Sequence, residues 1–498
     1  MSLQHYLALD LGAESGRAML GEFDGEQLRL TEAHRFPNGP VRLPDGFHWD
    51  ILRLWAEVKQ GIALAIRDHG SALASLGIDT WGVDFGLLDR NGALIGSPSH
   101  YRDSRTDGML EEAFRRVPRT EIFGQTGIQV LQINSLYQLL SMVVQRSPQL
   151  DIAQTFLTIP DLLNYWLTGQ TVCEFSNATT TQCYNPRQGD WARNMIEHLG
   201  IPAHIFPQIV PPGTNLGPLL PHVAAEVGLP SSGSVAVIAP ACHDTGSAVA
   251  AVPAPSPRFA WISSGTWSIV GAEVQEPVIN EKSLHYNFTN EGGVCGTFRF
   301  SRNLVGLWLV QECRRAWAQQ GEAYSYDEMV QMAAQAEPFQ AVLDPDDGEF
   351  FKPGDMPARI LSFCQRTRQP VPQNKGAMLR CILEGIALKY RWNLERLEEM
   401  LGYRLQPLHI VGGGTQNRLL LQLTADATGR QVLAGPIEAT ATGNILLQMI
   451  ALGHIASLPE GRELVRRSCT VLTYEPSGRS GWDEAYSRLL ALLETGGP

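Results

Sequence analysis

The feature that most constrains the fold of this sequence is a hairpin pattern that occurs once near the start of each half. Residues 6–11 have the apolar character of a buried strand, residues 12–16 form a turn of small and polar residues, and residues 17–23 resume as a strand. The same order recurs at residues 259–274, around a turn rich in serine and glycine. Two similar hairpins can arise by chance, but an internal duplication would give two domains of one fold.

A proline-rich segment, residues 253–257, lies between the two hairpins and suits a hinge or a domain boundary. Helical spacing of apolar residues follows each hairpin, most clearly at residues 51–68 and 377–401. We therefore expect an α/β protein with two domains, residues 1–248 and residues 249–498.

Charge and hydropathy exclude several classes of partner. The net charge of −12 gives no general attraction for nucleic acid or for an anionic membrane surface, so we expect neither partner. The most apolar long window, residues 235–255, contains His243, Asp244 and three prolines, which argues against a membrane span. The sequence starts without a secretory pattern, so we expect a cytoplasmic protein. Its oligomeric state stays open, a monomer included.

The eight cysteines are dispersed and form no zinc-type cluster, so we expect buried reduced thiols. Cys364 and Cys381 are close enough in sequence to bridge if a turn brings them together. Nothing else in the sequence requires that bridge.

Three turns of small residues each follow an apolar strand: residues 10–17, 263–268 and 411–417. Backbone N–H groups and hydroxyls in such turns can hold a phosphate group. The sequence lacks the usual P-loop, dinucleotide, zinc-protease and serine-hydrolase motifs. One such turn is usually only a turn, but three in this order indicate phosphate binding.

Acidic residues stand at the ends of two of the predicted strands. Asp10 leads into the first turn, where a carboxylate can hold hydrated Mg²⁺ or can simply cap the turn. Arg17 is either a phosphate partner or a surface residue of the next strand. Asp244 follows an apolar strand, at the kind of strand end where open α/β sheets bind ligands. It can accept a proton from an attacking hydroxyl, or else cap the following helix.

Taken as a set, several segments resemble the FGGY carbohydrate kinase family. They are Asp10-Leu11-Gly12, residues 78–85 (Ile-Asp-Thr-Trp-Gly-Val-Asp-Phe), residues 101–106, His243-Asp244-Thr245, residues 263–268 and residues 411–417. The likeness runs from about residue 5 to about residue 455. It implies two actin-like (ribonuclease H-like) domains with a catalytic cleft between them, and transfer of a phosphoryl group from ATP to a sugar.

The resemblance also implies a role for each matching residue. ATP would be contacted by the first phosphate loop and by the second domain: Ala13, Glu14, Ser15, Gly16, Arg17, Thr266, Gln311 and Gly413. The sugar pocket would be lined by Gly82, His243, Asp244, Thr245 and Asn303. Asp244 would be the general base, and Asp10 would organise Mg²⁺ through water. Glu14 would point away from the nucleotide, since its charge would repel phosphate.

The substrate is narrowed by further segments, residues 176–181, 290–293 and 306–309, which resemble family members acting on L-rhamnulose. The implied products are L-rhamnulose 1-phosphate and ADP. Another ketose such as L-fuculose or xylulose stays open, as does a non-catalytic actin-like nucleotide-binding protein. Many family members carry a polar pair, Gln-Arg or similar, where this chain has Trp81-Gly82-Val83, and this difference argues against a glycerol kinase. Trp81 itself suits either a wall of the sugar site or ordinary core packing.

Overall fold

The computed structural model describes residues 3–69, 73–230, 233–352, 354–478 and 480–495. The chain forms two compact units. The first contains Met1–Pro255, Val274–Phe300 and Ala439–Ser468, and the second contains Ser256–Glu273, Ser301–Glu438 and Cys469–Pro498. The compact units are thus interleaved along the chain. The division into residues 1–248 and 249–498 as functional domains stays a prediction.

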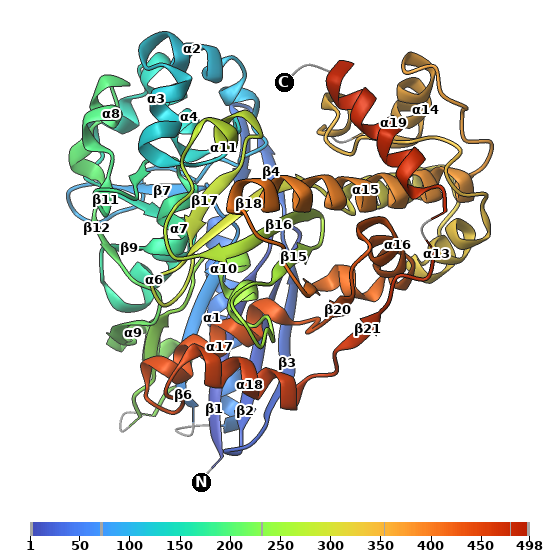
Figure 1. Ribbon diagram of the computed structural model, residues 1–498. Coiled ribbons are helices and arrows are strands. Elements are labelled where there is room, and N and C mark those ends of the chain that lie inside the picture. The colour runs from blue at the N-terminus through green and yellow to red at the C-terminus, as the bar shows by residue number, and fades with distance from the viewer. Residues whose placement is uncertain (1–2, 70–72, 231–232, 353, 479, 496–498) are drawn as a thin grey trace. The chain divides into compact units, whose positions relative to one another are not determined.

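The first unit is built on a six-stranded sheet of order β3-β2-β1-β6-β14-β13. Its strands are β1 (Gln4–Leu11), β2 (Ser15–Phe23), β3 (Leu28–Pro37), β6 (Leu73–Thr80), β13 (Thr214–Pro218) and β14 (Ala236–Ala239). Strands β1 and β2 form the predicted hairpin, β6 and β14 run parallel to β1, and β13 closes the edge antiparallel to β14. Figure 1 shows β1, β2 and β3 as long neighbouring strands.

The other large sheet has seven strands in the order β17-β18-β16-β15-β19-β20-β21, where β17 is Thr289–Gly292, and the six strands from β18 to β21 repeat the order of the first sheet. The second unit contributes β15 (Ala260–Ser264), β16 (Trp267–Val274), β19 (Leu408–Val411), β20 (Val432–Ala434), β21 (Leu472–Tyr474) and most of β18 (Phe298–Val305). The boundary between the units falls within β18, so Arg299 belongs to the first unit. The hairpin β15–β16 takes the place of β1–β2, β19 and β20 are parallel to β15, and β21 is antiparallel to β20. The duplication indicated by the two sequence hairpins is confirmed by this matching strand order.

Helices and short strands complete both units. In the first unit the helices are α1 (Ile51–His69), α2 (Met109–Arg116), α3 (Arg119–Thr126), α4 (Ser135–Val144), α5 (Pro148–Ile152), α6 (Ile159–Thr168), α7 (Phe175–Thr180), α8 (Arg193–His198), α9 (Pro221–Glu226), α10 (Asp244–Ala250), α11 (Glu281–His285), α17 (Ala439–Ala451) and α18 (Leu458–Ser468). Its short strands are β4 (Pro40–Leu43), β5 (Gly46–Trp49), β7 (Phe85–Leu88), β8 (Thr155–Thr158), β9 (Val172–Glu174), β10 (Tyr184–Asn185), β11 (Asp190–Trp191), β12 (Gln208–Val210) and β17 (Thr289–Gly292). The second unit adds α12 (Trp308–Gln319), α13 (Tyr326–Gln335), α14 (Met356–Arg366), α15 (Lys375–Leu401), α16 (Arg418–Thr428) and α19 (Trp482–Thr495).

Helices α1 and α17 cover opposite faces of the first sheet. Gly61 of α1 lies so close to Ala18 of β2 that a Cβ there would be 2.8 Å from the Ala18 methyl. On β2, Gly21 lies against Ile445 of α17. Side chains alternate along a strand, so positions 18 and 21 face opposite ways. The central strands are therefore buried on both faces, which explains their near-continuous apolar sequence.

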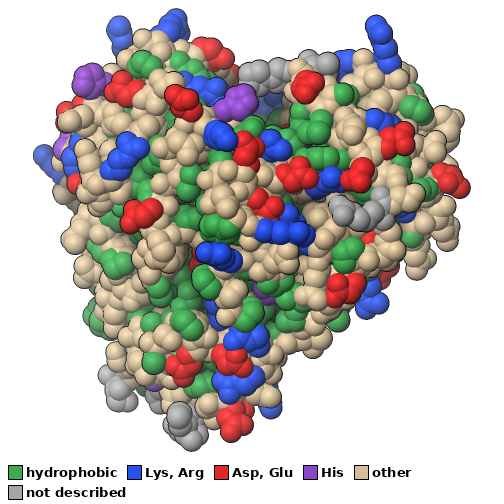
Figure 2. Space-filling model, in the orientation of Figure 1, with side chains coloured by type: hydrophobic (Ala, Val, Ile, Leu, Met, Phe, Trp, Pro, Cys, Tyr) green, Lys and Arg blue, Asp and Glu red, His purple; other side chains and the backbone are tan. Residues whose placement is uncertain are grey.

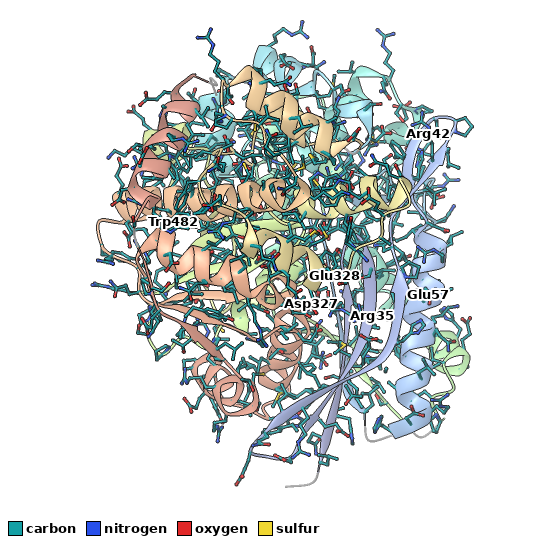
Figure 3. All side chains as sticks on the ribbon, turned by 90° about the vertical axis from the view of Figure 1, so that its right-hand side faces the viewer. Arg35, Arg42, Glu57, Asp327, Glu328 and Trp482 are labelled. Atoms are coloured by element: carbon teal, nitrogen blue, oxygen red, sulfur yellow. The ribbon has the colours of Figure 1, made fainter. Side chains whose placement is uncertain are left out.

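Helix α1 has the apolar stripe that its sequence spacing predicted. Its buried residues recur three or four positions apart along one face: Leu54, Val58, Ile62, Ala65 and Ile66. The other side of α1 reaches β3 through a contact of 2.6 Å between His34 and Glu57. Figure 3 shows Glu57 on α1 near Arg35 on β3.

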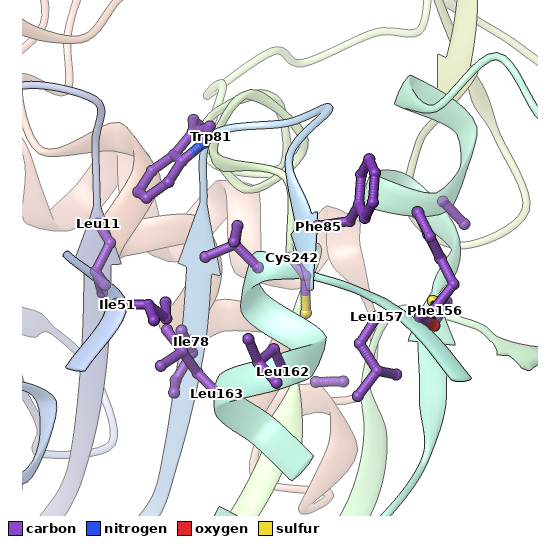
Figure 4. Packing of buried hydrophobic residues seen from close by; sticks show 14 of the residues in the cluster. Leu11, Ile51, Ile78, Trp81, Phe85, Phe156, Leu157, Leu162, Leu163 and Cys242 are labelled. Carbon is purple, nitrogen blue, oxygen red and sulfur yellow. Dashed lines mark hydrogen bonds between the residues drawn. The ribbon is translucent and has the colours of Figure 1, made fainter. Parts of the chain in front are cut away.

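The core of the first unit lies between β6 and α6. Ile78 of β6 and Leu162 and Leu163 of α6 are fully buried, as Figure 4 shows. Phe85 packs on Phe156 with ring centroids 4.8 Å apart. Burying each such side chain contributes about 1.5–3 kcal/mol to folding. This packing holds the end of β6, from which the Trp81–Phe85 segment begins.

Polar side chains set the register of α17 on the sheet. Gln448 donates to the carbonyl of Leu7 at 3.0 Å and accepts from the hydroxyl of Ser75 at 2.7 Å. Asn444, one turn earlier, donates to the carbonyl of Gly77 at 3.1 Å. These groups are buried, so sliding the helix would leave them unsatisfied. A segment far along the chain is therefore locked onto the first sheet.

Among the described residues, no helix is both long enough and apolar enough to cross a membrane. On the face in Figure 2, basic and acidic side chains are interspersed. Cys364 and Cys381 are both buried free thiols, and Cys381 donates to the carbonyl of Ala341 at 3.3 Å.

The contact between α10 and α17 yields a stability test. A Cβ at Gly443 would lie 1.8 Å from the carbonyl oxygen of Ser247, so Gly443→Ala must push the helices apart. We expect it to lower the free energy of unfolding by about 1–3 kcal/mol, measured by urea denaturation. Gly124→Ala is the matched control, because that helical position has no atom within 4 Å of the new methyl. Equal stability of both variants would contradict the packing described.

Candidate active site

The parallel strands of the first unit bring acidic residues to one edge of the sheet. Asp10 and Asp79 are directly opposed on β1 and β6. The next residue of β6, Thr80, pairs with His243, which places Asp244 beside the same edge. This is the carboxyl edge of the parallel strands, where ligands bind in open α/β sheets. Two of these acidic residues, Asp10 and Asp244, were predicted from strand ends, whereas Asp79 was not.

The acidic residues influence one another strongly. Asp79 is fully buried, accepts from Asn444 at 2.5 Å and has its other oxygen, Oδ1, without a hydrogen-bond partner among the described residues. Burial, and then the charge of Asp10, raises the pKa of Asp79 well above its usual range, and Asp244 adds to the effect. Asp10 is offset by Arg17, whose Nη2 lies 2.6 Å from Oδ2 of Asp10. A cation would relieve the remaining repulsion.

Asp244 has the geometry of a proton acceptor. It is the first residue of α10, and His243 rather than Asp244 occupies the N-cap position. Oδ1 of Asp244 accepts from the N–H of Thr245 at 2.5 Å and from its hydroxyl at 3.0 Å. The Nε2 atom of His243 lies 3.4 Å from the same oxygen. Among the described residues these polar contacts all reach Oδ1, so Oδ2 of this partly exposed side chain is open to a ligand.

A buried carboxylate, Glu174, stabilises the loop that carries His243 through hydrogen bonds. It accepts from the N–H and hydroxyl of Ser176 at 2.8 and 2.6 Å, and from the N–H of Cys242 at 2.9 Å. The Ser176 hydroxyl in turn accepts from the N–H of His243 at 3.1 Å. Burial raises the pKa of Glu174 to about 7. Sequence reasoning missed this residue, although residues 176–181 beside it carried part of the resemblance.

Trp81 lies in the core and does not offer an open ring face. Only 5% of its surface is exposed, and its ring centroid is 3.9 Å from that of Trp49. Both indole N–H groups donate to Oδ2 of Asp84, at 3.0 Å from Trp81 and 2.6 Å from Trp49. Burial raises the pKa of Asp84 to about 6. Of the two roles considered for Trp81, the structure favours core packing.

Gly82 lies between Trp81 and Val83 and packs closely against the Thr180 side chain. A Cβ at Gly82 would be 3.0 Å from the Thr180 side chain, so a larger residue must displace Thr180. The Thr180 hydroxyl accepts from the N–H of Val83 at 3.0 Å, and Val83 has a φ of +68°. Such a φ is uncommon outside glycine and marks a constrained segment. Gly82 itself is half-buried, and its predicted sugar contact stays a prediction.

The first small-residue turn is closed by its own backbone. The N–H of Gly12 donates to the carbonyl of Ser15 at 2.9 Å, and Asn38 donates from its side chain to Gly12 at 2.8 Å. Gly16 lies under Phe36, where a Cβ would be 2.2 Å from the ring. Ala13 and Ser15 are half-buried and Glu14 is exposed. The turn is thus a rigid loop next to Asp10 and Arg17.

The two other turns meet in the second unit, because β15 and β19 are adjacent parallel strands. Gly412 has a φ of +87°, and a Cβ at Gly414 would be 2.1 Å from Oγ of Ser264. These two glycines are required by packing. A Cβ at Gly413, in contrast, would meet no atom within 4 Å. Gly413 therefore faces open space, as a ligand-contacting glycine would.

Thr266 belongs to the turn at residues 263–268, and Gln311 lies on α12, the helix whose start is bonded to that turn. The carbonyl of Thr266 accepts from the N–H groups of Gly306 and Trp308 at 3.2 and 3.1 Å, which joins the turn to the start of α12. Gln311 follows on α12, and its Oε1 is buried without a hydrogen-bond partner among the described residues. An orphaned acceptor of this kind suits a donor on a ligand. Asn303, also in this unit, lies half-buried on β18.

The structure thus groups the predicted residues by unit. The first unit contains Asp10, Ala13, Glu14, Ser15, Gly16, Arg17, Gly82, His243, Asp244 and Thr245. The second contains Thr266, Asn303, Gln311 and Gly413. Their roles toward sugar and nucleotide stay predictions.

Comparison with known families explains the paired units. Residues 5–250 match the N-terminal domain of the FGGY family of carbohydrate kinases, and residues 260–452 match its C-terminal domain. The chain belongs to the FGGY family. This FGGY chain is 43% identical over 483 residues to a protein named rhamnulokinase from Bacteroides thetaiotaomicron, covering 97% of this chain and 98% of the relative. A protein of the same name from Oceanobacillus iheyensis is 40% identical, over 94% and 97% of the two chains.

Solved structures agree on the fold of this FGGY chain. Gluconate kinase from Lactobacillus acidophilus matches with a TM-score of 0.81 at 15% identity, over 99% of this chain and 98% of that one. Xylulose kinase from Rhodospirillum rubrum matches with a TM-score of 0.79 at 20% identity, over 99% of each chain. At such identities the likeness concerns the fold alone. The predicted α/β fold with two actin-like domains is confirmed.

Proposed function

We propose that this chain transfers the γ-phosphoryl group of ATP to the 1-hydroxyl of L-rhamnulose, giving L-rhamnulose 1-phosphate and ADP. The observation that carries the proposal is Asp244, a carboxylate with one oxygen held by donors and the other open, in a carbohydrate kinase. The choice of sugar is supported by the relatives named rhamnulokinase, at 43% and 40% identity. The proposed compartment is the cytoplasm.

In the proposed reaction the sugar hydroxyl attacks the γ-phosphorus while its proton passes to Oδ2 of Asp244. A new O–P bond forms, the bond to the β-phosphate oxygen breaks, and ADP leaves with that electron pair. Thr245 and His243 hold Oδ1 of Asp244, so the acceptor oxygen is oriented before the sugar arrives. Arg17, oriented by its ion pair with Asp10, supplies positive charge beside the phosphate loop.

The acidic edge fits a magnesium ion. Mg²⁺ prefers carboxylate oxygens and keeps several waters, and Asp10 and Asp79 offer such oxygens on adjacent strands. Oδ1 of buried Asp79 has no hydrogen-bond partner among the described residues, and burial followed by the charge of Asp10 raises the pKa of that carboxyl, so a nearby cation would favour its charged form. We propose that Asp10 holds the ion, through water. When bound, Mg²⁺ would neutralise charge on the ATP phosphates.

We propose the second unit as the main nucleotide site, with Thr266, Gln311 and Gly413 contacting ATP. The support is chemical: a neutral turn around Thr266, an orphaned acceptor on Gln311, and a glycine that faces open space. Gly82, His243, Thr245 and Asn303 are the proposed sugar contacts. A site that hydrogen-bonds specific hydroxyls rejects analogues lacking them.

The substrate is tested by coupled ADP release from the purified chain with L-rhamnulose, L-fuculose, D-xylulose and glycerol. We expect kcat/KM for L-rhamnulose to exceed each of the others by about tenfold or more, the usual size of such discrimination. A better rate with another ketose would make the sugar assignment wrong and leave the kinase reaction standing. ATP binding without ADP release on any sugar would favour a non-catalytic nucleotide-binding protein.

The proton acceptor is tested by Asp244→Asn. The amide cannot take the hydroxyl proton, so we expect kcat to fall by about 10²–10⁴-fold while ATP affinity, measured by calorimetry, changes little. Asp327→Asn serves as the control, because that residue is exposed on α13 (Figure 3) and should leave turnover unchanged. Turnover of Asp244→Asn close to wild type would show that the proton goes elsewhere.

The nucleotide role of the third turn is tested by Gly413→Val. Its side chain would occupy open space in the ligand-free chain, so we expect the thermal midpoint to change little. We expect KM for ATP to rise by about tenfold, equivalent to about 1.4 kcal/mol, with KM for the sugar much less affected. Gly414→Ala is the contrast, since it clashes with Ser264 and should lower stability instead. An equal rise of both KM values for Gly413→Val would argue against nucleotide contact.

A further inference from the structure

A buried ion pair contacts the His243 ring on the side opposite to Asp244. Arg299 on β18 is 0% exposed, and its Nε donates to the carbonyl of Gly292 at 2.8 Å. Its Nη2 lies 3.0 Å from Nδ1 of His243 and 3.1 Å from Oε2 of Glu291. Both charged residues lie in the same compact unit as His243. Neither residue has a role in the function proposed so far.

The chemistry of the guanidinium decides where the proton of His243 resides. Arginine carries only donors and stays protonated, so a nitrogen 3.0 Å from its Nη2 has to act as the acceptor. Nδ1 of His243 is that nitrogen, which leaves the ring proton on Nε2. The opposite tautomer could donate to Glu291 at 3.3 Å, but it would set the Nδ1 hydrogen against a hydrogen of Arg299.

The consequence reaches the proposed base, because Nε2 of His243 lies 3.4 Å from Oδ1 of Asp244. We propose that Arg299 and Glu291 form a positioning pair that holds His243 as its Nε2–H tautomer and aims that N–H at Asp244. This inference rests on the proposed function in taking Asp244 as the base. The pair itself need not touch sugar, nucleotide or the reacting atoms.

The pair makes physical sense as a unit. Glu291 offsets the charge of Arg299, since a lone guanidinium without solvent exposure would be costly to bury. The bond from Arg299 to the Gly292 carbonyl fixes the plane of the guanidinium. Because the Arg299 guanidinium is fixed, it fixes the orientation of the His243 ring. The His243 Nε2–H then stays directed at Oδ1 of Asp244. Proton uptake is thereby directed to Oδ2, the oxygen that faces the ligand.

The tautomer is measured directly by nitrogen NMR of protein labelled with ¹⁵N-histidine, without any substrate. The His243 signals are assigned by their absence in His243→Gln. We expect wild type to show a protonated Nε2 and an unprotonated Nδ1. A wild-type ring protonated on Nδ1 would overturn the proposal outright, whatever the enzyme phosphorylates.

The effect on catalysis is measured with the double variant Arg299→Met/Glu291→Gln, which removes both charges together. We expect mixed His243 tautomers and a fall in kcat of about 10–100-fold, as for a misplaced catalytic group, with KM for ATP little changed. Arg299→Lys keeps a hydrogen-bond donor at this position, so we expect its kcat to lie between those of the double variant and wild type. If the double variant does not fold, the kcat of Arg299→Lys and the wild-type spectrum still test the proposal. Unchanged tautomer and kcat in the folded double variant would contradict the proposal.

The matched control is a pair in the second unit with a buried arginine and a half-buried glutamate, Arg430 and Glu398, joined at 2.6 and 2.9 Å. Arg430→Met/Glu398→Gln should lower stability but leave the His243 spectrum and kcat unchanged. The same loss of kcat in the control would mean that the effect is general destabilisation. Failure of wild type to phosphorylate any ketose would sink the proposed function, while the spectrum would still answer whether the pair sets the tautomer.

Discussion

Repulsion between carboxylates at the carboxyl edge of one sheet is the constraint on which the site of the first unit depends. Parallel strands necessarily end at the same edge, and here they bring Asp10, Asp79 and Asp244 together. Two unit charges about 4 Å apart at an effective dielectric constant of about 20 repel by about 4 kcal/mol. Burial is the largest cause of the raised pKa of Asp79, the charges of Asp10 and Asp244 add to it, and Asn444 and Arg17 counteract it.

Asn444, which donates a hydrogen bond to the buried Asp79 carboxylate, comes from a distant part of the chain. Asn444 lies 365 residues beyond Asp79 and reaches it only because α17 packs on the first sheet. Gln448 and the close approach of Gly443 to Ser247 hold that helix in one register. The acidic edge is therefore stabilised by the same contacts that fold residues 439–468 onto the first unit.

How much the sequence could predict follows from the range of each signal. The duplicated hairpin, and Asp10 and Asp244 at strand ends, were predictable because strand periodicity and turn chemistry are local. Asp79 with Asn444, and Glu291 with Arg299, depend on tertiary pairing that leaves no local pattern. Trp81 could not be assigned from its own position, since its neighbour Trp49 and their shared acceptor Asp84 lie elsewhere in the chain. The roles toward sugar and nucleotide came from resemblance.

The two units show how one strand order can serve two chemistries. At the carboxyl edge of the first sheet the side chains are acidic, whereas at the same edge of the second sheet they are small and neutral, in the turns around Ser264 and Gly413. An acidic edge repels a polyphosphate unless a cation lies between them, but it can accept a proton. A neutral edge of glycine and hydroxyl groups can approach a nucleotide closely, but it offers no base. In the proposed function, phosphoryl transfer from ATP to a hydroxyl needs both properties, and the difference in charge between the two edges suits that proposal.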